Sequence, residues 1–157
     1  MREKVKTTFR GQGLNQPQTF TVSHPDNMLS VAQSILAAFP GERIFTLSGE
    51  LGSGKTTLVK SFAKALGIND DVLSPTFSIV HEYGSGDHQI YHFDLYRLKN
   101  EQELMQIGFE EYLGQGAYVF IEWPDVARNL LPEKWVSITL EAVNEHERKI
   151  ICRIENT

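Results

Sequence analysis

The chain has 157 residues, of which 41% are hydrophobic, so it has the size of one domain with a single hydrophobic core. Its formal net charge of −5 excludes a global basic excess of the kind that binds a nucleic-acid backbone, and any link to RNA is expected to run through a partner or a local patch. Cys152 is the single cysteine, which excludes an intramolecular disulfide, and the absence of a signal-peptide pattern or of an apolar run of about 18 residues leads us to expect a cytoplasmic protein without membrane contact.

Hydrophobic periodicity and turn residues predict the secondary structure. Residues 1–16 mix basic residues with glycine and asparagine, so we expect a flexible N-terminal tail followed by one domain over residues 17–157. In chain order, the pattern then predicts a strand over 19–22, a helix over 28–36, a strand over 43–48, a helix over 56–66, strands over 77–83 and 88–93, a helix broken between 101–107 and 109–113, a strand over 117–121, and strands over 135–140 and 149–154. Ser23 or Asp26 is expected to cap the first helix.

Residues 49–56 read GELGSGKT and match the phosphate-binding pattern G-x-x-x-x-G-K-[ST] at every fixed position. The glycines let successive backbone N–H groups turn toward an anion at the positive end of the helix that follows. Lys55, expected as an exposed charge of the loop, adds a cation toward the β and γ phosphates, and the Thr56 hydroxyl is placed to ligate magnesium. The residues predicted to hold the nucleotide are Gly49, Gly52, Ser53, Gly54, Lys55, Thr56 and Thr57.

The order of these elements indicates the fold class. Strands that alternate with helices around a phosphate-binding loop predict a three-layer α/β fold of the P-loop NTPase type. Glycine-rich residues 84–87 and the Asn144-Glu145 pair each predict a hairpin, so the sheet is expected to be mixed, with helices on its faces. In such folds the ligand binds at the carboxyl ends of the strands.

Two acidic residues are expected at that edge. Asp94 ends the apolar run before it, and Glu122 ends residues 118–121, so each is a candidate to hold magnesium or to act on the γ-phosphate. An acid at such a position also caps helices or forms ion pairs, and Arg97 follows Asp94 closely, so that reading stays open. Thr76, in the turn SPTF, is a candidate switch residue near the γ-phosphate, with an ordinary capped turn as the alternative.

Four segments together resemble the TsaE family, also called YjeE, of small bacterial ATPases. They are GELGSGKTT at 49–57, SPTF at 74–77, HFDLYR at 92–97 and EWP at 122–124, and the resemblance spans roughly residues 20–140. It implies participation in the threonylcarbamoyl modification of adenosine 37 of tRNA, called t6A. It further implies ATP and Mg²⁺ as cofactors and association with a TsaB–TsaD heterodimer, with tRNA reached only through that complex.

The resemblance also assigns roles to residues of this chain. It implies that Lys55 and the loop amides hold the phosphates, that Thr56 and Glu122 serve the magnesium, and that Asp94 is the Walker B-like acid. Trp123 is expected beside the site.

Two other function classes stay open from the residues alone. A small-molecule kinase of this fold needs arginines in a lid, yet no arginine occurs between Arg97 and Arg128. A GTPase is disfavoured because no N-K-x-D base-reading tetrad occurs, so adenine is expected. A binding module gated by nucleotide, with incidental hydrolysis, also fits the sequence.

His88 and His92 lie about 13 Å apart on a strand, too far to share a metal, and both are expected to be structural or surface residues.

Overall fold

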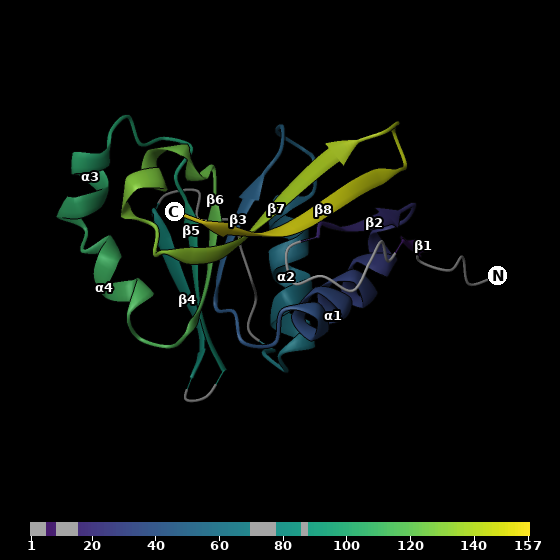
Figure 1. The fold of residues 1–157 in the computed structure, drawn as a ribbon, viewed down its shortest axis with the longest axis horizontal. Coiled ribbons are helices and arrows are strands. Elements are labelled where there is room, and N and C mark those ends of the chain that lie inside the picture. Colours follow the sequence, from purple (N-terminus) through teal and green to yellow (C-terminus); the bar gives the residue numbers. More distant parts are fainter. Residues whose placement is uncertain (1–5, 9–15, 70–77, 86–87) are drawn as a thin grey trace.

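A computed structural model of the chain describes residues 6–8, 16–69, 78–85 and 88–157 (Figure 1). Its elements are β1 (Lys6–Thr8), β2 (Gln18–Val22), the 3-10 helix η1 (Pro25–Asn27), α1 (Met28–Ala38), β3 (Ile44–Ser48), α2 (Lys55–Ala65), β4 (Val80–Ser85), β5 (His88–Asp94), α3 (Glu101–Gln106), α4 (Phe109–Leu113), β6 (Tyr118–Glu122), the 3-10 helix η2 (Pro124–Leu130), β7 (Lys134–Ala142) and β8 (Arg148–Asn156).

The described strands form one mixed sheet of eight strands in the order β1-β2-β8-β7-β3-β6-β5-β4. The centre of the sheet is parallel, because β3 pairs in parallel with β6 and β7, and β5 pairs in parallel with β6. The hairpins β4–β5 and β7–β8 are antiparallel, as are the pairs β2–β8 and β1–β2. The predicted mixed α/β sheet is therefore confirmed.

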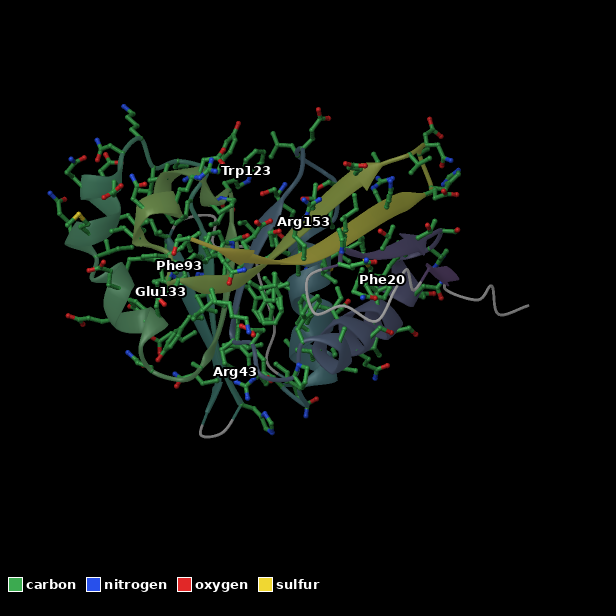
Figure 2. All side chains as sticks on the ribbon, in the orientation of Figure 1. Phe20, Arg43, Phe93, Trp123, Glu133 and Arg153 are labelled. Atoms are coloured by element: carbon green, nitrogen blue, oxygen red, sulfur yellow. The ribbon has the colours of Figure 1, made fainter. Side chains whose placement is uncertain are left out.

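Helices cover both faces of this sheet, which gives the three expected layers (Figure 1). On the α1 and α2 side, Phe62 stacks on Phe120 of β6 with ring centroids 4.6 Å apart. On the α3 and α4 side, Phe93 of β5 meets Phe109 edge to face at 5.0 Å. Figure 2 shows Phe93 toward α4 and Phe20 toward α1. Because successive strand residues point to opposite faces, apolar residues at neighbouring positions of one strand serve different cores.

The N-terminal region differs from the sequence prediction in two places. Lys6–Thr8 pairs with β2 as an edge strand, which the sequence did not predict, and the division into a tail and a domain at residue 17 stays a prediction. Neither Ser23 nor Asp26 caps α1: the N-cap is Asn27, without a side-chain hydrogen bond. Pro25 begins the 3-10 turn η1 one turn earlier, where the His24 side chain accepts from the backbone N–H of Asp26.

Two further points bear on the site. Residues 70–77, which include Thr76, lie outside the described part of the chain, so the proposed switch residue is not placed. Within the described residues, no helix has the length and apolar character needed to cross a membrane.

Candidate functional site

The loop predicted to bind phosphate joins the end of β3 to the start of α2. Gly54 is the N-cap of α2 with φ 105°, and Gly52 has φ 77°, conformations that glycine adopts without steric cost. No side-chain hydrogen bond caps α2. The first N–H groups of this 11-residue helix are therefore available to an anion.

Close packing around the loop requires glycine and leaves one polar atom unsatisfied. A Cβ at Gly49 would lie 2.6 Å from the backbone oxygen of Leu140 and 2.6 Å from Oγ of Ser53, so no side chain fits there. Ser53 is buried, and its Oγ has no hydrogen-bond partner among the described residues. A buried hydroxyl without a partner costs about 1–3 kcal/mol. A phosphate oxygen in the loop would offer that hydroxyl an acceptor.

Lys55 is buried, with 5% of its surface exposed, although a loop lysine was expected to be exposed. Its Nζ donates to the carbonyl oxygens of Gly49 at 2.5 Å and Glu50 at 3.0 Å, and lies 4.2 Å from the ring centre of Trp123. Burial lowers the pKa of Lys55, and the nearby carboxylates of Glu122 and Asp94 oppose that shift. The cation is thus held by carbonyl oxygens of its own loop and by an aromatic face.

Glu122 connects helix α2 to the strands β5 and β6 through hydrogen bonds. It ends β6 and is only 2% exposed. The Thr56 hydroxyl donates to its carboxylate at 3.1 Å from Oε1 and 3.2 Å from Oε2. Nε2 of His92 lies 2.6 Å from Oε2 of the same carboxylate. The first turn of α2 is therefore joined directly to the carboxyl end of β6.

Asp94 stands opposite Glu122 on the neighbouring parallel strand β5. Its Oδ1 accepts from the backbone N–H of Tyr96 at 3.1 Å. Burial raises the pKa of Asp94, and the Glu122 carboxylate adds to this, while the Tyr96 N–H, His92 and Lys55 act in the opposite direction. The two acids thus have different surroundings, because Glu122 is enclosed by hydrogen-bond donors and Asp94 is partly open to solvent.

Trp123 follows Glu122 in a strained backbone conformation. Its φ of 57° is the only positive value for a non-glycine among the described residues. Its backbone N–H donates to Leu47 at 3.3 Å, and its ring centroid lies 4.9 Å from that of Tyr96. Figure 2 places Trp123 at the upper edge of the molecule, the edge at which Figure 1 shows the loop between β3 and α2. The predicted position of Trp123 beside the loop agrees with its contact with Lys55.

A cavity of about 370 Å³ opens beside the loop. Gly52, Gly54 and Thr57 line it on the loop side, and Met28 and Val22 supply apolar surface. Its polar lining comes from Ser23, Ser53, His24, Glu145, His146 and Arg148. The sequence did not predict this cavity, since it is formed by residues near both ends of the chain that become neighbours only through the pairing of β2 with β8.

The structure thus brings together Lys55 and Thr56, at the start of α2, with Asp94 and Glu122, at the carboxyl ends of β5 and β6. Sequence reasoning missed one residue, because His92 was assigned to a structural or surface role. Its signal was available: His92 precedes Asp94 by two residues and so shares its face of the sheet.

The donor set determines which metal fits here. Among the described residues, no three His, Cys, Asp or Glu side chains are arranged to hold a metal ion by themselves. Magnesium keeps several waters and binds through one or two carboxylates together with substrate phosphates. The Thr56 hydroxyl and the carboxylates of Glu122 and Asp94 therefore fit Mg²⁺ together with bound phosphate, and do not form a complete protein cage.

Comparison with known proteins gives a consistent picture. Residues 22–150 match the model of the family described as "Threonylcarbamoyl adenosine biosynthesis protein TsaE". The Bacillus subtilis protein named tRNA threonylcarbamoyladenosine biosynthesis protein TsaE is 40% identical over 130 residues, covering 81% of this chain and 79% of the relative. A Rickettsia conorii protein of the same name is 33% identical over 135 residues, covering 85% of this chain and 75% of the relative. The crystal structure of YdiB from Bacillus subtilis superimposes with a TM-score of 0.72 at 30% identity, covering 93% of this chain and 90% of that one.

Proposed function

The chain belongs to the TsaE family of threonylcarbamoyl adenosine biosynthesis proteins, and we propose that it is a Mg–ATP hydrolase that supports the t6A modification of tRNA adenosine 37. One observation supports this proposal more strongly than the others. The Thr56 hydroxyl, at the start of the loop helix, is hydrogen-bonded to the buried Glu122 carboxylate at the end of a central strand. P-loop NTPases hold magnesium with this pair of groups, a loop Ser or Thr and a strand-end acid.

Each residue then has a role that follows from its surroundings. The loop amides and Ser53 Oγ bind phosphate oxygens, and Lys55 exchanges the carbonyls of Gly49 and Glu50 for the β and γ phosphates. Magnesium held by Thr56 and Glu122 neutralises phosphate charge when it is bound. Asp94 lies one strand from Glu122 and is partly open to solvent, so it accepts a hydrogen bond from the attacking water. Thr76 is proposed as the switch residue.

The cavity beside the loop is proposed to hold the adenosine part of ATP. Ligand sites are mostly apolar concavities of roughly 300–1,000 Å³ with a few polar groups, and the cavity of about 370 Å³ has this character. Because Gly52, Gly54 and Thr57 line it, a nucleoside there stays connected to phosphates in the loop. Met28 and Val22 supply apolar surface for the base, and Arg148 adds a cation to the cavity lining.

We further propose that the protein acts in the cytoplasm with a TsaB–TsaD-like heterodimer and reaches tRNA only through that complex. The net charge of −5 supports the indirect route, since direct binding to a nucleic-acid backbone depends on neutralising phosphates with lysine and arginine.

One alternative also has a structural argument. Among the described residues, no arginine forms an ion pair or hydrogen bond with Asp94 or Glu122, and an arginine aimed at the transferred phosphoryl group is worth about 10³–10⁵ in rate. A nucleotide-gated docking module, in which ATP only stabilises a binding surface, needs no such arginine.

One experiment distinguishes the hydrolase from the nucleotide-gated docking module. Single-turnover hydrolysis of ATP is measured beside the affinity of the chain for the heterodimer in ATP and in ADP. The hydrolase predicts that the complex hydrolyses ATP faster than the chain alone. A module predicts that affinity depends on the bound nucleotide while hydrolysis is unaffected by the partner, and that result would overturn the hydrolase.

A further inference from the structure

His92 is a completely buried histidine beside the proposed magnesium site. It is 0% exposed and lies on β5 between Tyr91 and Phe93, which pack into the core on the opposite face of the sheet. His92 itself faces the side of α1 and α2, as Ile90 does. Its Nε2 lies 2.6 Å from Oε2 of Glu122, so a polar contact between two buried side chains crosses from β5 to β6.

The chemistry of this contact fixes which nitrogen carries hydrogen. A carboxylate only accepts hydrogen bonds, so Nε2 of His92 is the donor in this contact. Nδ1 is buried and has no hydrogen-bond partner among the described residues. Leaving a buried polar atom unpaired costs about 1–3 kcal/mol. An apolar side chain would therefore fill this position at lower cost, unless the bond to Glu122 is needed.

We propose that His92 is a positioning residue that fixes the Glu122 carboxylate for its work on the magnesium-bound nucleotide. Glu122 receives two donors from different elements, the Thr56 hydroxyl from α2 and Nε2 from β5. With Thr56 alone, the carboxylate can rotate about its terminal bond. With His92 as the second donor, Oε2 is held from a second direction, so the carboxylate has a fixed orientation beside the first turn of α2.

Groups that orient a metal-binding side chain typically contribute 10–100-fold to metal affinity or activity. The role assigned here rests on the proposed function, because it takes Glu122 as a magnesium residue. The His92–Glu122 hydrogen bond does not depend on hydrolysis and is tested separately below.

The first test compares three variants. His92→Leu removes the donor and fills the space, His92→Gln keeps an N–H donor at a similar reach, and His88→Leu is a control on the same strand at an exposed position. We expect His92→Leu to lower turnover at saturating Mg–ATP by about 10–100-fold and to raise the Mg²⁺ concentration for half-maximal turnover by about tenfold. His92→Gln should recover most of both losses, and His88→Leu should match the wild type.

If His92 only supported the fold, its replacement would not selectively change the magnesium-dependent measurements. Affinity for ADP without magnesium should stay within about twofold of the wild type in every variant, while the gain in affinity on adding Mg²⁺ should shrink only in His92→Leu. In a Glu122→Gln background, adding His92→Leu should lower turnover by less than about twofold further, because the two residues act through one contact.

A spectroscopic test needs no hydrolysis. In the full chain labelled with ¹⁵N-histidine, His92 should show the Nε2–H tautomer, and Glu122→Ala should change that signal while leaving His88 unchanged.

His92→Leu with wild-type turnover, magnesium dependence and circular dichroism would overturn the proposal, as would a His92 signal that Glu122→Ala does not alter. If the wild-type chain does not hydrolyse ATP, the proposed function fails, but the magnesium-dependent affinity and the tautomer still decide the role of His92. If His92→Leu does not fold, His92→Gln and the tautomer decide it.

Discussion

Lys55 is enclosed by its own loop, because its ammonium group contacts two carbonyl oxygens and the Trp123 ring. Burial lowers the pKa of Lys55, while the carboxylates of Glu122 and Asp94 oppose that shift, so an added anion would further favour the charged form. In the proposed function a phosphate group supplies that anion, and Lys55 then exchanges the carbonyl oxygens of Gly49 and Glu50 for phosphate oxygens.

Lys55→Ala is expected to weaken ADP and ATP binding by about 10–100-fold, since a hydrogen bond to a charged group is worth about 1.5–3 kcal/mol. The fold should persist, with unfolding free energy changed by less than about 1 kcal/mol, because the removed charge is one that burial disfavours. Calorimetric titration and urea unfolding measure the two effects. Lys60→Ala, at an exposed position of the same helix, is the control, and wild-type affinity in Lys55→Ala would contradict the assignment.

The two acids should affect turnover more than binding. Glu122→Ala and Asp94→Ala are each expected to lower turnover at saturating Mg–ATP by about 10²–10³, because placed charge acts mainly in the transition state. Nucleotide affinity should fall by less than about tenfold. Steady-state kinetics combined with titration separates the two quantities. Unchanged turnover in either variant would return that acid to a purely structural role.

Asp94 also makes a testable contribution to stability. Because its pKa is raised above 3.8 in the fold, the folded state binds this proton more tightly than the unfolded chain does. Its contribution to stability is therefore present at low pH and is lost as pH rises through the window between 3.8 and the raised pKa. Asp94→Asn removes the partly buried charge and keeps an acceptor for the Tyr96 N–H.

We therefore expect Asp94→Asn to raise Tm at pH 7 by about 1–2 °C, and the difference to disappear as pH falls below 3.8. Thermal unfolding at a series of pH values measures this directly. A variant that is less stable than the wild type at pH 7 would show that the Asp94 charge stabilises the site instead.

At the scale of elements, the turn from β6 into η2 holds Trp123 over Lys55 at the cost of backbone strain. A left-handed conformation costs an L-residue roughly 1–2 kcal/mol, and glycine avoids most of that cost. Trp123→Ala and Trp123→Gly both remove the ring, its contact with Tyr96 and its contact with Lys55. Only the glycine variant also relieves the strain.

Trp123→Ala should therefore be less stable than Trp123→Gly by about 1 kcal/mol, as measured by urea unfolding. Equal stability of the two variants would mean that φ at residue 123 relaxes once the ring is gone.

The elements also show what the sequence could predict. The strands β3 and β6 and the helix α2 follow from apolar periodicity, and the loop between them from its fixed pattern of glycines and lysine. The start of α1 was not predictable from capping residues alone, because Pro25 begins a 3-10 turn earlier in the chain. The spacing of His92 and Asp94 indicates that they share one face of the sheet, but the contact of His92 with Glu122 depends on the register between β5 and β6, which single-strand patterns do not contain.

For the whole molecule, the sheet order explains why the site is assembled from distant segments. The central strands β7, β3, β6 and β5 run parallel, so the loop, Asp94 and Glu122 meet at one edge of the sheet. The pairing of β2 with β8 brings residues near 23 and near 146 to the same edge, where they line the cavity beside the loop. The cavity therefore required the three-dimensional structure, because nothing in either segment alone indicates the other.

The whole chain is expected to be a slow ATPase on its own. Among the described residues, no arginine contacts the proposed catalytic acids, and we propose that a docked partner supplies charge or orders the site.

The most direct test of this account is the steady-state release of phosphate from Mg–ATP by the chain alone, with a purified TsaB–TsaD-like heterodimer, and with the heterodimer plus tRNA. Each mixture is repeated with Lys55→Ala. We predict slow release by the chain alone, an increase of at least about tenfold with the heterodimer, and loss of that increase in Lys55→Ala. Equal rates in wild-type and Lys55→Ala mixtures, with binding to the heterodimer verified independently, would contradict the assignment of this chain as a Mg–ATP hydrolase.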